Sequence, residues 1–85
     1  MSYKIRLKRS AEKELDALPP RFHDKIIKAI LALQTNPYPP KVKKLHGREG
    51  ARIRVGNFRV LYLVREASKE IEIFSVANQK DVYRY

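Results

Sequence analysis

The segment from Arg52 to Val64 constrains the fold of this chain more than any other. It reads Arg-Ile-Arg-Val-Gly-Asn-Phe-Arg-Val-Leu-Tyr-Leu-Val, and its Gly56-Asn57 dipeptide suits a two-residue turn between two β-strands. In such a turn the flanking residues pair in order, and side chains alternate between the two faces of the ribbon. One face then carries only apolar side chains, from Ile53, Val55, Phe58 and Val60. The segment therefore predicts an antiparallel hairpin with one core-facing side.

The other face of this hairpin gathers three arginines, Arg52, Arg54 and Arg59. Like charges directly opposite each other across two strands are unfavourable, so folding alone does not require this arrangement. A bound anion would explain it, because guanidinium groups match phosphate oxygens. The alternative is a face of solvated arginines, since charged side chains usually lie in water. A longer turn would shift the alternation and scatter the three.

The charge of the whole chain favours an anionic partner. Nineteen Lys and Arg residues stand against nine Asp and Glu residues, which gives a net charge of +10. The excess is concentrated in residues 41–65, which contain eight basic residues and one acidic residue. Such a field attracts phosphate-rich or acidic partners. No basic amphipathic helix with an aromatic face accompanies it, so we expect nucleic acid or an acidic protein as partner and no membrane.

The composition makes several other classes of protein and site improbable. The chain has no cysteine, so disulfides and thiolate metal sites are excluded. His23 and His46 are too few and too far apart to suggest a zinc site, and we expect no metal and no cofactor. The N-terminus has no apolar run of signal-peptide length, which predicts a cytoplasmic protein. We expect one small domain over residues 1–85.

Two helices are expected before the hairpin. Ser10 can cap the first, and Pro19-Pro20 ends it because the residue before a proline avoids helical geometry. The second should run from about Pro20 to Thr35 and stop at Asn36-Pro37. The apolar stripe of the first helix consists of Ala11, Leu15 and Leu18. That of the second consists of Phe22, Ile26, Ala29, Ile30 and Leu33, widened by Ile27 and Leu31.

The remaining segments complete an α+β fold. Residues 3–8 alternate in the manner of a half-buried strand, and residues 71–76 are apolar on both faces, as in a central strand. Residues 37–50 contain three prolines and two glycines and are predicted to form a loop. The order is β-α-α-β-β-β: a sheet of about four strands with a helical hairpin on one face. The arginines should then point to the open face.

Several further residues have two interpretations. Lys41, Lys43, Lys44 and Arg48 either extend the arginine face and bind phosphate or belong to a plain solvated loop. Lys80 and Arg84 either contact a phosphate backbone or solubilise the C-terminal tail. Tyr62 falls on the same face as Phe58, which favours packing in the core over a functional role.

The ordered set of these motifs resembles the RelE/ParE superfamily of toxins from type II toxin–antitoxin systems, and the RelE-like branch in particular. The resemblance rests on the opening strand, on the two helices joined at a double proline, and on the arginine hairpin. It also includes the sequence Ser-Ala-Glu-Lys-Glu-Leu from Ser10, the sequence Lys-Leu-His-Gly from Lys44, and the ending Asp-Val-Tyr-Arg from Asp81. It extends over nearly the whole chain.

The resemblance implies a function and a partner. RelE-type toxins enter the ribosomal A site and cut messenger RNA, and a cognate antitoxin wraps around the toxin and blocks it. The resemblance assigns catalytic roles to basic residues at the positions of Arg52, Arg54 and Arg59 and to a tyrosine matched by Tyr83. Tyr83 has an alternative role, the packing of its ring on the sheet. The reaction would be a metal-independent attack by the 2′-OH of the RNA.

One departure from the RelE pattern leaves alternatives open. RelE-type tails commonly carry a basic or histidine–arginine pair where this chain has Asn78-Gln79. If Gln79 replaces a catalytic arginine, one cation or proton donor is lost. The ParE branch shares the fold and inhibits DNA gyrase without cutting RNA. A third alternative is a non-catalytic relic that only binds its antitoxin.

Overall fold

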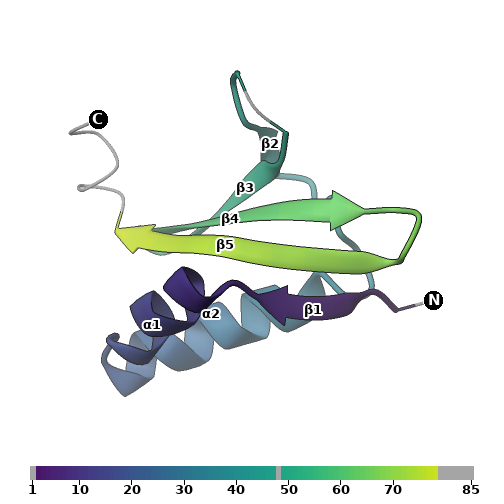
Figure 1. The fold of residues 1–85 in the computed structure, drawn as a ribbon. Helices are drawn as coiled ribbons and strands as arrows, with labels where there is room; N and C mark the ends of the chain where they lie inside the picture. Colours follow the sequence, from purple (N-terminus) through teal and green to yellow (C-terminus); the bar gives the residue numbers. More distant parts are fainter. Residues whose placement is uncertain (1, 48, 79–85) are drawn as a thin grey trace.

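The computed structural model describes residues 2–47 and 49–78, which form two helices and five strands (Figure 1). The helices are α1 (Arg9–Asp16) and α2 (Pro20–Ala32). The strands are β1 (Lys4–Leu7), β2 (Lys43–Lys44), β3 (Ala51–Val55), β4 (Phe58–Arg65) and β5 (Glu70–Asn78). The predicted α+β class is confirmed. Neither helix is long and apolar enough to cross a membrane.

The strands form one sheet in the order β1-β5-β4-β3-β2. The first strand pairs with β5 in parallel, and the other neighbours are antiparallel. The position of β5 between β1 and β4 confirms the central place predicted for this strand. The sheet has five strands where about four were expected, because Lys43 and Lys44 pair with β3. A two-residue strand inside a proline-rich segment is too short to leave a periodic signal in the sequence.

The hairpin formed by β3 and β4 has the predicted register. Val55 pairs with Phe58, and Ile53 pairs with Val60. Gly56 occupies the first central position of the turn with φ of +61°. Both common two-residue hairpin turns require positive φ at this position, which glycine adopts without steric cost. The local sequence therefore fixes which side chains share a face.

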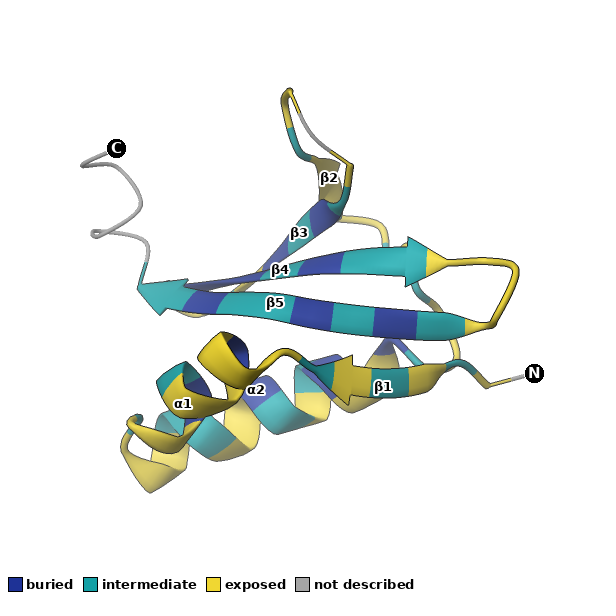
Figure 2. Cartoon of the chain, in the orientation of Figure 1, coloured by how far each residue is buried: buried dark blue, intermediate teal, exposed yellow. Residues whose placement is uncertain are grey.

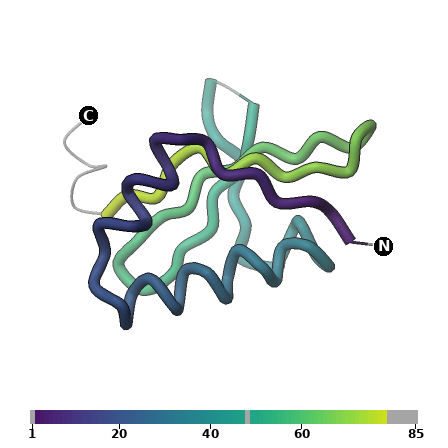
Figure 3. The backbone as a smooth tube through the Cα atoms, turned by 60° about the horizontal axis from the view of Figure 1, so that its bottom comes forward, coloured from purple at the N-terminus to yellow at the C-terminus, as the bar shows by residue number. Residues whose placement is uncertain are grey.

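The hydrophobic core lies between one face of the sheet and the two helices. Figures 1 and 3 show α1 and α2 on the same side of the sheet, as predicted. The helices contribute Ala11, Leu15, Ile26 and Ile30 to the core, and Leu33 follows directly after α2. The strands contribute Ala51, Ile53, Phe58, Val60, Tyr62, Ile71, Ile73 and Val76. The rings of Phe22 of α2 and Phe58 of β4 contact each other in a tilted arrangement with centroids 5.3 Å apart, which joins the second helix to the hairpin.

An irregularity between β4 and β5 explains why β5 is apolar on both faces. Leu61 pairs with Ser75 whereas Tyr62 pairs with Ile73, so Phe74 is an extra residue on β5. Buried and partly buried residues alternate along β5 on both sides of this point (Figure 2). The extra residue reverses the alternation, which lets both Ile73 and Val76 face the helices. Phe74 then lies on the open face of the sheet, which is the face that the helices do not cover.

Three details of the helices differ from expectation. The first helix begins at Arg9 with Lys8 as N-cap, so the prediction of Ser10 as the cap is wrong; its hydroxyl instead donates to the carbonyl oxygen of Phe74 at 3.4 Å. The second helix ends at Ala32, and residues 33–35 form a turn. Leu31 is 52 % exposed, so it does not widen the apolar stripe. It points about 100° around the helix axis from Ile30, which faces the sheet.

Candidate nucleic-acid interface

The hairpin register places Arg52, Arg54 and Arg59 together on the face that the helices leave open. Arg54 and Arg59 are direct cross-strand partners, and Arg52 lies two residues from Arg54 along β3. Side chains two residues apart in a strand point the same way, and direct partners share a face. The predicted clustering of the three arginines is therefore present in the structure.

The short strand β2 adds a second pair of cations that the sequence did not predict. Lys43 of β2 pairs directly with Arg52 of β3. Two cross-strand pairs, Lys43 with Arg52 and Arg54 with Arg59, thus lie side by side across three strands. Since like charges in this arrangement repel, their placement is a cost to folding that a bound anion would remove.

These residues line a cavity of about 320 Å³ that we call the cationic cavity. Its five basic residues are Lys41, Lys43, Arg52, Arg54 and Arg59, and its other lining residues are Pro40, Val42 and Ile53. None of these residues carries a carboxylate. The cavity therefore presents nitrogen donors and positive charge, which are the groups that bind phosphate in water-accessible sites.

A β-turn holds Lys41 at the wall of the cavity. The backbone N–H of Val42 donates to the carbonyl oxygen of Pro39 at 3.0 Å, which closes a turn with Pro40 and Lys41 at its centre. Proline at the second position of such a turn has its φ angle already fixed. Further back, the hydroxyl of Tyr62 donates to the carbonyl oxygen of Pro37 at 2.7 Å. The segment that carries Lys41 is thus anchored to the core.

The arginines differ in burial. Arg54 is exposed and Arg52 is partly buried, whereas Arg59 is 7 % exposed and is the one charged residue in the buried class among residues 2–47 and 49–78. Arg59 lies on β4 between Arg54 of β3 and Ala77 of β5. The alternative of a face of solvated arginines therefore does not fit Arg59, because an arginine side chain is rarely buried unless it takes part in an interaction.

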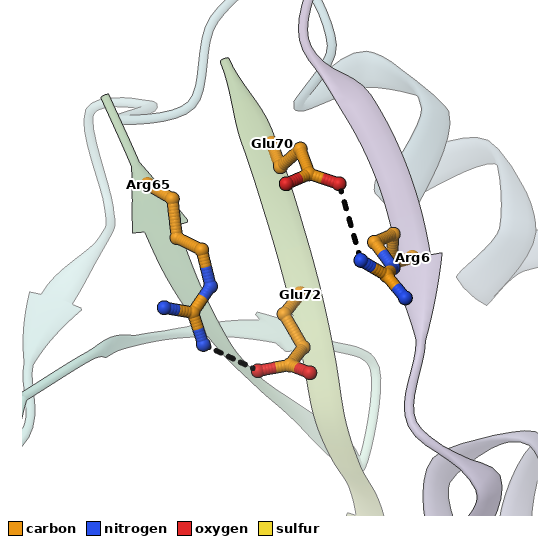
Figure 4. A network of polar contacts seen from close by, with 4 residues as sticks. All are labelled: Arg6, Arg65, Glu70 and Glu72. Carbon is orange, nitrogen blue, oxygen red and sulfur yellow. Dashed lines mark hydrogen bonds and ion pairs between the residues drawn. The ribbon is translucent and has the colours of Figure 1, made fainter. Parts of the chain in front are cut away.

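The opposite end of the open face is electrically balanced. Arg6 lies 3.4 Å from a carboxylate oxygen of Glu70, and Arg65 lies 3.2 Å from one of Glu72 (Figure 4). A hydrogen bond from Ser68, together with the charge of Arg6, lowers the pKa of Glu70 and keeps it ionised. No such ion pair within the described part of the chain involves Lys41, Lys43, Arg52 or Arg54. Within the described residues, these four cations of the cationic cavity are thus close together without a carboxylate partner.

The other basic residues named from the sequence lie elsewhere. Lys44 pairs with Ala51, faces away from Lys43, and lines a separate cavity with Tyr38, Leu45 and Leu63. Asn78 is at the end of β5 opposite Phe58 and does not line the cationic cavity. The positions of Arg48, Gln79, Lys80, Tyr83 and Arg84 lie outside the described residues. Tyr62 is fully buried, as expected of a core residue.

The sequence did not predict that Lys43 pairs with Arg52 or that Pro40 and Val42 line the cavity. The sequence Lys41-Val42-Lys43 does alternate as a strand does, but three residues carry too little signal to predict pairing. The pairing follows from the hairpin loop between β2 and β3, in which Leu45 N–H donates to the Gly50 carbonyl oxygen at 3.1 Å.

An apolar groove of about 560 Å³ adjoins the cationic cavity. It runs between α2 and β3, and its lining includes Ala29, Ala32, Leu33, Ile53 and Val55. Pro40, Lys41, Ile53 and Arg54 line both the groove and the cavity. An apolar surface next to a cationic one suits an amphipathic segment with acidic residues.

Comparison with known proteins gives a consistent result. The family model described as "ParE toxin of type II toxin-antitoxin system, parDE" matches residues 5–83. A curated protein of Methanocaldococcus jannaschii, named as a candidate toxin RelE1, is 31% identical over 88 residues. That alignment covers 99% of this chain and 98% of the relative.

Solved structures agree with the sequence comparison. The archaeal RelE–RelB complex from Pyrococcus horikoshii contains a chain with a TM-score of 0.82 and 27% identity, covering 93% of this chain and 97% of that one. The RelBE2 toxin–antitoxin complex from Mycobacterium tuberculosis gives a TM-score of 0.80 and 26% identity, covering 92% and 99%. The expected RelE-like fold is therefore confirmed.

Proposed function

The chain belongs to the RelE/ParE superfamily of toxins from type II toxin–antitoxin systems, and from this premise we propose that it is a ribosome-dependent endoribonuclease that cleaves messenger RNA. The observation that carries the proposal is the cationic cavity, in which five basic residues converge without a carboxylate. RNA offers the phosphates that such a cavity would bind. The RelE-type relatives point the same way.

The chemistry requires no metal. The 2′-oxygen of one ribose attacks the adjacent phosphorus, a new P–O bond forms, and the bond to the 5′-oxygen breaks. A base accepts the 2′-OH proton, an acid donates one to the leaving 5′-oxygen, and cations stabilise the extra negative charge of the transition state. We assign this last role to Arg52, Arg54 and Arg59, whose guanidinium groups stay protonated and donate paired hydrogen bonds.

The base is proposed from the family resemblance alone. Tyr83 lies outside the described residues and is the tyrosine that matches the family tail. A reference tyrosine has a pKa of about 10, so ionisation at neutral pH needs a nearby cation or help from the ribosome. If Gln79 replaces the basic residue that RelE-type tails commonly carry, cleavage by this chain should be slow.

An antitoxin is the proposed protein partner. The similar structure from Pyrococcus horikoshii is a RelE–RelB complex, and that from Mycobacterium tuberculosis is a RelBE2 toxin–antitoxin complex. We propose that the cognate chain lays an amphipathic helix in the groove between α2 and β3, and that its acidic residues reach Lys41 and Arg54, which the groove shares with the cationic cavity.

A second function has one observation in its favour. The family model that matches residues 5–83 is described as a ParE toxin, and the ParE branch inhibits DNA gyrase. Under this alternative the basic residues would serve protein or DNA binding and no message would be cut. A relic that binds only its antitoxin is the remaining alternative.

Induced expression in a bacterial host separates these functions. We expect growth arrest on expression of the chain alone, rescue by its antitoxin, and new 5′ ends within translated messages by primer extension. Arrest with intact messages and relaxed or cleaved plasmid DNA would support gyrase inhibition. Normal growth at a high level of folded protein would indicate a relic and contradict both toxin activities.

A further inference from the structure

We propose that the cationic cavity binds two successive phosphates of one RNA strand, the first at Arg54 and Arg59 and the second at Lys43 and Arg52. This inference rests on the proposed RNA-cleaving function and divides the arginines of the hairpin between two positions. The phosphate under attack would lie at the Arg54–Arg59 pair. The neighbouring phosphate would lie at a second subsite that exists only because β2 joins the sheet.

The sheet register builds two sets of donors. Lys43 lies directly opposite Arg52, and Arg54 lies directly opposite Arg59. Direct partners on one face of a sheet have Cβ atoms about 5 Å apart, so each pair can hold one anion between its two side chains. Each pair joins two different strands, and β3 supplies one arginine to each.

The separation of the two pairs fits a nucleic-acid backbone. Arg52 and Arg54 are two residues apart on β3, which is roughly 6.5 Å along an extended strand. Successive phosphates of an extended single strand are spaced similarly by the intervening ribose. A diester chain laid along β3 would meet the two pairs in turn.

The surroundings of the second pair favour a backbone over an isolated ion. Lys41, two residues before Lys43, is held at the wall of the same cavity by the turn closed between Pro39 and Val42, so a further cation is available to the strand. The apolar atoms of Pro40 and Val42 complete the wall, where a ribose or base would pack. The cavity of about 320 Å³ suits part of a strand and not a folded partner.

The chain supplies a matched control. Lys43 and Lys44 are consecutive residues of β2, and both are exposed. Lys43 lines the cationic cavity, whereas Lys44 pairs with Ala51 and lines a different cavity. Lys43→Gln and Lys44→Gln therefore remove the same charge from the same strand on opposite faces. Neither change touches the core, and thermal unfolding of both variants verifies that each is folded.

The test is equilibrium binding of the full chain to ribosomes programmed with a message that carries a 2′-O-methyl group at the target nucleotide, which blocks cleavage. We expect Lys43→Gln to weaken binding on the order of tenfold and Lys44→Gln by about twofold or less. Messages with a neutral methylphosphonate at the phosphate on the 5′ side or on the 3′ side of the scissile phosphate complete the test. At one of these two positions the loss caused by Lys43→Gln should disappear.

Each outcome decides between stated alternatives. Equal binding of Lys43→Gln and Lys44→Gln would overturn the second subsite while leaving the proposed function intact. Lys43→Gln could also weaken binding equally on both methylphosphonate messages. Lys43 would then contact another anion, such as ribosomal RNA or an acidic protein, and the second subsite would again be overturned. Failure of the parent chain to bind programmed ribosomes would contradict the proposed function itself.

Discussion

The hydroxyl of Tyr62 donates a hydrogen bond of 2.7 Å to the carbonyl oxygen of Pro37. This bond ties a fully buried residue of β4 to the segment that carries Pro40 and Lys41 into the cationic cavity. Burial, with a smaller contribution from the charge of Tyr38, raises the pKa of Tyr62 to about 12. The core and the cavity wall are thus linked through one titratable group.

Tyr62→Phe should change both the stability and its dependence on pH. At neutral pH the lost hydrogen bond should reduce the free energy of unfolding by about 1 kcal/mol. Because folding raises the pKa of Tyr62, the neutral hydroxyl is favoured in the folded state. Its contribution is complete below the unfolded value of about 10 and is lost as pH rises through 12.

Urea unfolding of both proteins from pH 8 to pH 12 checks this expectation. The parent should lose on the order of 2 kcal/mol more than Tyr62→Phe over the upper two pH units, because phenylalanine has no proton to release. Groups that do not interact with Tyr62 contribute equally to both proteins and cancel in the difference. Parallel curves for the two proteins would show that Tyr62 does not carry this dependence.

The backbone at Gly50 leaves no room for a side chain. Its φ is +127°, and a Cβ there would lie 3.0 Å from the carbonyl oxygen of Tyr62 and 3.1 Å from Leu45 Cδ1. We expect Gly50→Ala to destabilise the fold by about 2–3 kcal/mol. Gly47→Ala is the control, since its φ is +73° with nothing within 4 Å, and it should cost about 1 kcal/mol. Equal losses in urea unfolding would contradict the close approach at Gly50.

The fold was largely predictable because its signals are local. The Gly56-Asn57 turn and the alternation around it fix the register of β3 and β4, and hence the face of the arginines. What escaped prediction depends on tertiary pairing. Lys43 joins the sheet only because β3 is already in place beside it. The reversal of alternation at Phe74 likewise follows from the pairing of β4 with β5 and not from the sequence of either strand alone.

The candidate site was predictable in part for the same reason. The sequence brought Arg52, Arg54 and Arg59 to one face, and the structure places them together in one cavity. The sequence suggested the same role for the four basic residues within residues 41–48. In the structure Lys41 and Lys43 line the cationic cavity, whereas Lys44 lines a different cavity. The burial of Arg59 was not foreseen, because it depends on neighbours from two other strands. The role of Tyr83 stays a prediction.

Binding to RNA should depend steeply on salt. Each phosphate that the protein neutralises on a single strand contributes a slope of about −0.7 to a plot of log affinity against log salt. Arg54→Gln should make this slope shallower by about 0.7, whereas Lys44→Gln should leave the slope set by the cavity unchanged. Titrations of programmed ribosomes between about 50 and 200 mM salt measure it. Affinity that stays flat over this range would instead favour an apolar protein target.

The C-terminal tail yields a prediction about the base. Tyr83→Phe keeps the aromatic ring and removes only the hydroxyl, so it should lower cleavage by about 10²–10⁴-fold with little change in stability. Gln79→Arg should raise the cleavage rate if a cation is missing at that position. Single-turnover rates on ribosome-bound message measure both. Undiminished cleavage by Tyr83→Phe would remove this tyrosine from the mechanism.

The variant Arg54→Gln tests most directly whether RNA is cleaved in the cationic cavity. Arg54 is exposed, so its replacement should leave the core intact, in contrast to a change at the buried Arg59. Lys44→Gln serves as the control of equal charge on the other face of the sheet. Loss of a charge-assisted phosphate contact costs about 1.5–3 kcal/mol, which corresponds to roughly ten- to a hundredfold in rate.

The measurement is single-turnover cleavage of a ribosome-bound message by the parent, Arg54→Gln and Lys44→Gln. We predict cleavage by the parent, a rate ten- to a hundredfold lower for Arg54→Gln, and a rate within about twofold of the parent for Lys44→Gln. Equal rates for the parent and Arg54→Gln would contradict the role of the cavity. Absence of cleavage by all three proteins would contradict the nuclease function and favour one of the two alternatives that cut no RNA, a gyrase inhibitor or a relic.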